Sequence, residues 1–147
     1  MTIAQRLAET TWDGSLVDGE GTIHSGSGAL DRLEVTWAAR TETPGGKTSP
    51  EELAAAAHAS CFSMALALVL GKAKTPPRRL TVEATVTLDE VDGVPTIVSS
   101  ALQVRGWAAG TDGAGFQKSV DEAAALCPIS RLFAGAQITV EATWLPA

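Results

Sequence analysis

Two cysteines are the residues of this chain that are best suited to covalent chemistry. Cys61 lies inside a long apolar stretch, and Cys127 directly precedes a proline. A thiol becomes a nucleophile or a redox group when it is ionised to the thiolate. Free cysteines are also among the most buried residue types, so two core positions are the simpler interpretation of the count alone. A structural disulfide is not expected, because an intracellular chain keeps its thiols reduced.

His58 lies three residues before Cys61 and would share a helix face with it. The two side chains could be metal ligands, but zinc requires four, and the only other histidine and thiol are His24 and Cys127. We therefore expect no metal site. His58 could instead be the base of a cysteine hydrolase with Cys61 as nucleophile, although no third, orienting residue is evident. The simplest alternative is a histidine packed inside a helix interface.

The stretch around Cys61 is predicted to be one long helix. Ser49 is expected to be its N-cap and Glu52 to complete a capping box, while Gly71 is suited to the C-terminal end. The residues three and four positions from Cys61 are His58 and small or apolar side chains, so its face is smooth and uncharged. Such surroundings raise the pKa of the thiol unless another part of the fold supplies a cation.

Glu51 has no capping role in this helix. A carboxylate that is solvated and favoured by the helix dipole is one interpretation. Ten residues separate Glu51 from Cys61, which corresponds to ~15 Å along a helix axis and about 80° around it. The two side chains cannot meet within one helix. If Glu51 assists the thiol, it most simply does so from a partner subunit across a two-fold axis.

Period-two alternation and turn residues predict the remaining elements. Residues 1–147 are expected to form a single α+β domain built on antiparallel strands, with Cys127 at the N-cap of a short helix that starts at Pro128. The expected strands are Ala8–Leu16, Thr22–Ser25, Leu33–Ala39, Leu80–Leu88, Thr96–Trp107 and Gln137–Trp144, and the second long helix is Phe116–Leu126.

Composition excludes several classes of function. The net charge is -6, from 11 Lys and Arg against 17 Asp and Glu, so a nucleic-acid or anionic-membrane surface is not expected. Leu53–Leu70 is uncharged and near the minimum length of a membrane span, but its content of Ala and Ser with a central histidine favours a buried helix of a soluble protein. The charged N-terminal segment does not read as a secretion signal, so we expect a cytoplasmic protein.

The motif KTSPEELAAAAHASCFSMAL at residues 47–66 and the downstream Cys127-Pro128 pair resemble the family of osmotically inducible protein C and organic hydroperoxide resistance proteins, OsmC/Ohr. The N-terminal WDGSLVDGEGTIHSGSGAL is similar to the opening hairpin of that family, so the resemblance covers nearly the whole chain. His58 and the FSMAL run are closer to the OsmC branch. The resemblance implies antiparallel sheets wrapped around long central helices, in an intertwined homodimer whose active sites lie at the interface.

The resemblance also implies a thiol peroxidase without a cofactor. Cys61 matches the peroxidatic cysteine and Cys127 the resolving cysteine, which would form a disulfide that a dithiol of the lipoyl type reduces. The essential arginine and glutamate of the family match Arg40 and Glu51, with Arg105 or Arg131 as alternatives for the arginine. An apolar lining would favour organic hydroperoxides over hydrogen peroxide. The residues expected in this lining are Phe62, Met64, Ile129, Leu132 and Phe133.

Two other classes of function stay open from the sequence. A cysteine hydrolase would use Cys61 without needing Cys127. A non-enzymatic redox sensor or hydrophobe-binding module would be oxidised once, without repeated turnover. The peroxidase interpretation requires both thiols to lie within bonding reach of each other.

Overall fold

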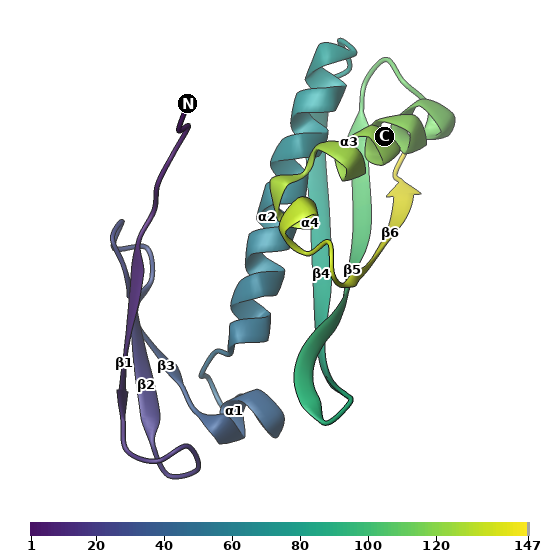
Figure 1. The fold of residues 1–147 in the computed structure, drawn as a ribbon. Helices are drawn as coiled ribbons and strands as arrows, with labels where there is room; N and C mark the ends of the chain where they lie inside the picture. Colours follow the sequence, from purple (N-terminus) through teal and green to yellow (C-terminus); the bar gives the residue numbers. More distant parts are fainter. Residues whose placement is uncertain (147) are drawn as a thin grey trace. The chain divides into compact units, whose positions relative to one another are not determined.

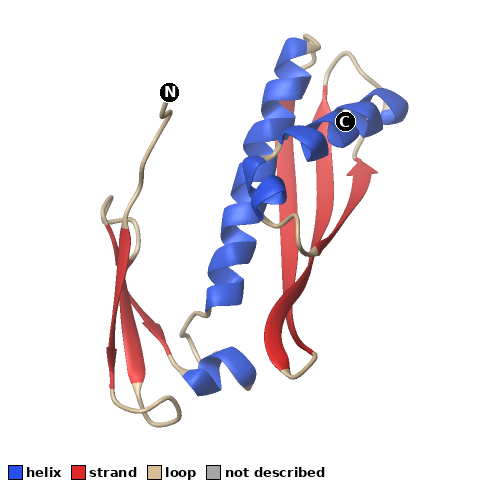
Figure 2. Ribbon diagram, viewed as in Figure 1, coloured by secondary structure: helices blue, strands red, loops and turns tan. Residues whose placement is uncertain are grey.

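The computed structural model describes residues 1–146 of the chain. The chain divides into two compact units, Met1–Leu53 and Ala54–Ala147, which we describe in turn. Helix α2, Pro50–Lys72, is continuous through the boundary between them. The expected α+β class is confirmed, with two three-stranded sheets and four helices in the described residues (Figures 1 and 2). The expectation of one domain over residues 1–147 stays a prediction.

The first unit contains an antiparallel sheet in the order β1-β2-β3. Its strands are β1 (Ala8–Asp13), β2 (Glu20–Ser25) and β3 (Asp31–Val35). The hairpin expected at the N-terminus is therefore present. The β1 strand ends earlier than predicted because the chain turns at Gly14, whose φ of 91° suits a residue without a Cβ.

The prediction of a strand over Leu33–Ala39 is wrong in its second half. The β3 strand ends at Val35, and helix α1 occupies Trp37–Thr41. The hydroxyl of Thr36 caps this helix by accepting a hydrogen bond from the backbone N–H of Ala39 at 3.0 Å. The alternating letters LEVTWAA fit a strand, but the capping threonine starts a helix that places Arg40 near its end.

Helix α2 begins where the sequence predicts. The Ser49 hydroxyl accepts a hydrogen bond from the backbone N–H of Glu52 at 3.1 Å, as expected of an N-cap. The other half of the predicted capping box does not form. The Glu52 carboxylate accepts instead from the hydroxyl of Thr48 at 2.7 Å, because a threonine one residue before the cap is within reach.

By length and hydropathy, α2 is the one helix in the described chain that could cross a membrane. Its most apolar window has a mean hydropathy of 1.9, and 33% of that window is buried inside the chain. The buried face contributes Phe62, Leu66 and Leu70 to the core, and the opposite face exposes Met64 and Leu68. The helix is therefore divided into a packed face and an apolar face that nothing in the described chain covers.

The second unit contains a sheet in the order β4-β5-β6. The long antiparallel hairpin of β4 (Pro77–Val91) and β5 (Val94–Ala108) is present as predicted. The expected antiparallel pairing holds for β1 to β5, whereas β6 (Gln137–Trp144) pairs with β5 in parallel. The intervening α3 (Gly113–Leu126) and α4 (Pro128–Leu132) form the crossover that a parallel pair requires.

Helices α2, α3 and α4 lie on one face of this second sheet (Figure 1). The core between them and the sheet is made of apolar side chains from α2, β5 and α3, and it is closed by Cys127. Its members are Phe62, Ala65, Leu66, Val69, Leu70, Leu102, Val104, Ala108, Phe116, Val120, Ala123 and Cys127. Cys61 packs against the edge of this core.

We predict that Gly106→Ala destabilises the protein by about 1–3 kcal/mol, as expected for overpacking of a core. A Cβ at Gly106 would lie 2.5 Å from a methyl group of Leu80 and 3.1 Å from the ring of Phe116. The matched control is Gly135→Ala, where a Cβ would meet no atom within 4 Å. Urea unfolding should show the control within about 0.5 kcal/mol of the wild type. Equal stability of both variants would contradict this packing.

Candidate active site: two thiols, a buried histidine and an arginine–glutamate pair

The second unit brings the two thiols together. Cys61 lies in the middle of α2 and is partly buried, whereas Cys127 has no exposed surface and is the N-cap of α4. Pro128 occupies the first turn of that short helix, where its missing N–H removes no bond. Both cysteines are free thiols, and the side chain of Cys127 is a hydrogen-bonding neighbour of Cys61.

The surroundings of Cys61 oppose its ionisation. Burial raises the pKa of the Cys61 thiol, and the neighbouring Cys127 raises it further. A hydrogen bond from the backbone of Ile129 acts in the opposite direction and lowers this pKa. None of the groups in the described chain that shift this pKa is a cation. The sequence-based expectation of a raised pKa, in the absence of a cation, is confirmed.

His58 is fully buried one turn before Cys61 on α2. Its Nδ1 lies 2.6 Å from the hydroxyl oxygen of Ser100 on β5, and its Nε2 lies 2.8 Å from the hydroxyl oxygen of Ser130 on α4. The ring of Phe133 meets the imidazole edge-on, with 5.4 Å between centroids. Burial lowers the pKa of His58, which favours the neutral imidazole. The interpretation of His58 as a residue packed between elements fits this geometry.

The two serines were not found from the sequence. A signal for Ser100 exists, because it occupies an inward position in the alternation of β5, in register with the buried Leu102 and Val104. A polar residue at such a position needs a hydrogen-bond partner. Ser130 follows the Cys-Pro motif directly, but nothing in its spacing indicates contact with His58.

The first unit holds the Arg40–Glu51 pair. The guanidinium of Arg40 donates to the Glu51 carboxylate through Nε at 3.1 Å to both oxygens and through a terminal nitrogen at 2.6 Å. The side chain of Glu51 is 12% exposed and that of Arg40 is 30% exposed. The arginine also lies 6.0 Å from the ring centroid of Trp37. Arg40 and Glu51, the two residues that match the arginine and glutamate of the family, therefore form a two-pronged ion pair, with Glu51 at the start of α2 and Arg40 near the end of α1.

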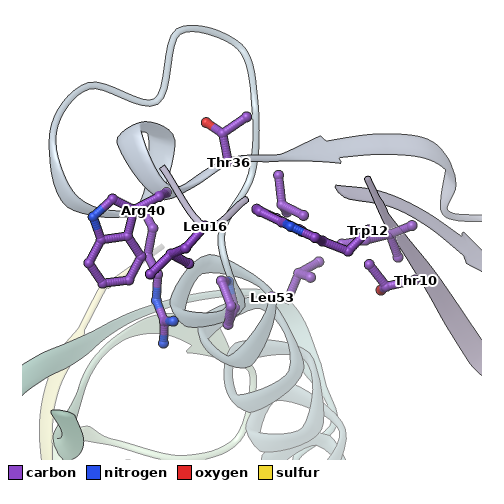
Figure 3. Close-up of a pocket in the computed structure, with 10 residues that line it drawn as sticks. Thr10, Trp12, Leu16, Thr36, Arg40 and Leu53 are labelled. Atoms are coloured by element: carbon purple, nitrogen blue, oxygen red, sulfur yellow. The ribbon is translucent and has the colours of Figure 1, made fainter. Parts of the chain in front are cut away.

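Next to this pair, the first unit has an apolar pocket of about 380 Å³. Figure 3 shows the side chains of Trp12, Leu16 and Leu53 around it, with Arg40 at its border. Its remaining lining comes from β1, β2, β3, the start of α1 and the start of α2: Thr10, Ile23, Val35, Thr36, Trp37 and Pro50. An arginine at the border of an apolar pocket is suited to a ligand with one polar and one apolar end.

The residues predicted to line the substrate site differ in their exposure to solvent. Phe62 has no exposed surface and belongs to the core, so its burial argues against direct contact with a substrate. Met64 and Leu132 are exposed, while Ile129 and Phe133 are partly buried. Leu132 and Phe133 line a second pocket, of about 330 Å³. The rest of that pocket is formed by Ala54, Thr96, Ile97, Gly135 and Ala136.

Comparisons with known proteins extend over most of this chain. The family model described as OsmC-like protein matches residues 43–143. The peroxiredoxin OsmC of Escherichia coli (strain K12) is 38% identical over 141 residues, which is 96% of each chain. The organic hydroperoxide resistance protein OhrB of Bacillus subtilis superposes with a TM-score of 0.71 at 26% identity and covers 93% of this chain and 98% of its own.

An organic hydroperoxide resistance protein OsmC from Legionella pneumophila has the same fold, with a TM-score of 0.77 at 22% identity over 99% of this chain and all of its own. The matched region of the family model contains both cysteines, His58 and Glu51. The motifs, the fold and the full-length similarity lead to one conclusion. This chain belongs to the OsmC-like protein family.

Proposed function

We propose that this protein is a thiol peroxidase that reduces organic hydroperoxides. The observation that carries the proposal is the adjacent pair of Cys61 and Cys127 in one unit, with Cys61 partly buried and Cys127 fully buried beside it. The full-length relative named a peroxiredoxin and the structural neighbours named for organic hydroperoxide resistance support the same reaction.

The reaction needs both sulfurs in sequence. The Cys61 thiolate attacks one oxygen of the hydroperoxide, the O–O bond breaks, and the departing alkoxide takes a proton to leave as an alcohol. Cys61 is then a sulfenic acid. The Cys127 sulfur attacks it, a disulfide forms, and the hydroxyl leaves as water. An external dithiol returns the disulfide to two thiols and is itself oxidised to a disulfide.

The activation of Cys61 is assigned to Arg40. Burial raises the pKa of Cys61, so a thiolate at neutral pH requires a cation nearby. Glu51 would fix the fork of Arg40 so that its remaining N–H groups face the sulfur and the peroxide. Glu51 and Cys61 are ten residues apart on α2, which corresponds to ~15 Å along the helix.

We therefore propose that the pair acts on Cys61 of a partner subunit in a homodimer. The uncovered apolar face of α2, with Met64 and Leu68 exposed, supports burial of this helix against a second copy. A chain that is monomeric at working concentration would contradict this assignment. The alternatives for the cation within the sequence are Arg105 and Arg131.

The preference for an organic substrate rests on apolar lining. The pocket beside Arg40 and the pocket formed by Leu132 and Phe133 are both built mainly of apolar side chains, which favour an alkyl or lipid tail over water-sized hydrogen peroxide. A small dithiol of the lipoyl type is the proposed reductant. The proposed location is the cytoplasm, where reductants keep both cysteines as thiols between turnovers.

The hydrolase alternative is disfavoured by the hydrogen bonds of His58. A general base needs a free ring nitrogen within reach of the nucleophile. Ser100 and Ser130 occupy both ring nitrogens of His58, so neither is available to Cys61. A redox sensor would be oxidised only once, whereas a peroxidase turns over repeatedly. Repeated turnover therefore distinguishes the two.

The first test measures the consumption of an alkyl hydroperoxide with dihydrolipoamide as reductant. We expect multiple turnovers in the wild type and none in Cys61→Ser. Cys127→Ser should form a sulfenic acid on Cys61, detectable by mass spectrometry after trapping, but should lose sustained cycling. Equal rates for all three proteins would end the peroxidase proposal. A single equivalent consumed by the wild type would instead indicate a sensor.

The second test concerns the arginine. Arg40→Lys keeps the charge but removes the planar fork, so we expect kcat/KM for the alkyl hydroperoxide to fall about 10- to 100-fold, the effect of losing a charged hydrogen bond. The matched control is Arg105→Lys, which changes an exposed arginine on β5. The control should keep wild-type kcat/KM. The reverse result would assign the activating role to Arg105.

A further inference from the structure

The hydrogen bonds of His58 connect three elements of the second unit. The imidazole belongs to α2, its Nδ1 meets Ser100 of β5 at 2.6 Å, and its Nε2 meets Ser130 of α4 at 2.8 Å. His58 and Ser100 have no exposed surface, and Ser130 is 9% exposed. Hydrogen bonds in such dry surroundings are stronger than at the surface, and an unpaired polar atom there is costly. The link therefore holds its three elements in a fixed arrangement.

His58 contacts α4 through Ser130, and two groups at the start of this helix affect the Cys61 thiol: Cys127 and the backbone of Ile129. Helix α4 is only five residues long, and it starts directly after Cys127. The residue before Ser130 is Ile129, whose backbone hydrogen bond lowers the pKa of Cys61. A helix this short has little stability of its own, since most of its backbone groups lack partners within the helix. Its position must come from contacts such as the one between Ser130 and His58.

We propose that His58 is a positioning residue for Cys61. The His58 ring bonds Ser100 of β5 on one side and Ser130 of α4 on the other, and so holds α4 against α2. This contact fixes the first turn of α4 so that the backbone N–H of Ile129 is directed at the Cys61 sulfur. This role rests on the proposed function of Cys61 as the attacking thiol. The histidine does not touch the substrate or exchange a proton with the sulfur.

A neutral imidazole is well suited to this position. It offers one donor and one acceptor on opposite sides of a rigid ring, and each serine hydroxyl can adopt the complementary role. The lowered pKa of His58 agrees with the neutral form. The edge-on contact with Phe133, the residue that follows α4, fixes the ring from a further side. A shorter or more flexible side chain could satisfy one of the serines but not both.

Substituting His58 by an amide residue tests its two hydrogen bonds separately. The amide of glutamine reaches about as far as Nε2 and that of asparagine about as far as Nδ1, so His58→Gln keeps a group for Ser130 while His58→Asn keeps one for Ser100. The readout is the pKa of Cys61, followed by the ultraviolet absorbance of the thiolate against pH. All proteins carry Cys127→Ser, so that a single thiol titrates.

We expect His58→Asn to raise the pKa of Cys61 by about one unit, because the hydrogen bond from Ile129 to the thiolate is weakened. His58→Gln should change it by less than half that shift. Ser130→Ala should follow His58→Asn, and Ser100→Ala should follow His58→Gln. These serine variants remove one oxygen each and keep the test valid if a histidine variant does not fold.

The control for general loosening is Val120→Ala, which removes apolar atoms from the core on α3 and leaves the residues of α4 and the hydrogen bonds of His58 unchanged in type. It should lower the unfolding midpoint and leave the pKa of Cys61 unchanged. An unchanged pKa in both His58→Asn and Ser130→Ala would overturn the positioning role, and so would an equal rise in Val120→Ala. The readout needs no turnover, so it fails or succeeds independently of the peroxidase proposal.

Discussion

The site depends on one constraint, which is that the thiol of Cys61 must ionise beside an apolar core. Cys61 packs against the same cluster of side chains that holds α2 to the second sheet, and this burial raises the pKa of its thiol. The packing that stabilises the fold therefore opposes the charge that the chemistry needs. Any function of Cys61 as a thiolate requires compensation from polar groups that the fold places nearby.

The proposals above supply two kinds of compensation, which differ in range. The backbone of Ile129 is a local dipole whose effect depends on the placement of one short helix. The guanidinium of Arg40 carries a full positive charge whose direction Glu51 fixes, and it belongs to the first unit. In these proposals the buried His58, which anchors the short helix, and Glu51, which orients the arginine, serve the same purpose. Each fixes the geometry of a group that could otherwise turn away.

The sequence predicted those features that depend on local rules. The N-cap at Ser49, the inward alternation of β4 and the start of α4 after Cys127 follow from residue types and spacing. The family resemblance singled out both cysteines, Arg40 and Glu51 as candidate site residues, and the structure pairs the last two. Contacts between distant segments could not be read in this way. His58 meets Ser100 and Ser130 across 42 and 72 residues, and no single-sequence rule encodes such a meeting.

The complete burial of Cys127 also decides how a Cys61–Cys127 disulfide would be opened. An incoming dithiol must approach a sulfur in line with the bond that it breaks, and of the two cysteines only Cys61 has any exposed surface. The mixed disulfide would then form on Cys61, and Cys127 would depart as the leaving thiol into the core. Access would thereby set the order of bond exchange, and in the proposed cycle the residue that meets the oxidant would also meet the reductant.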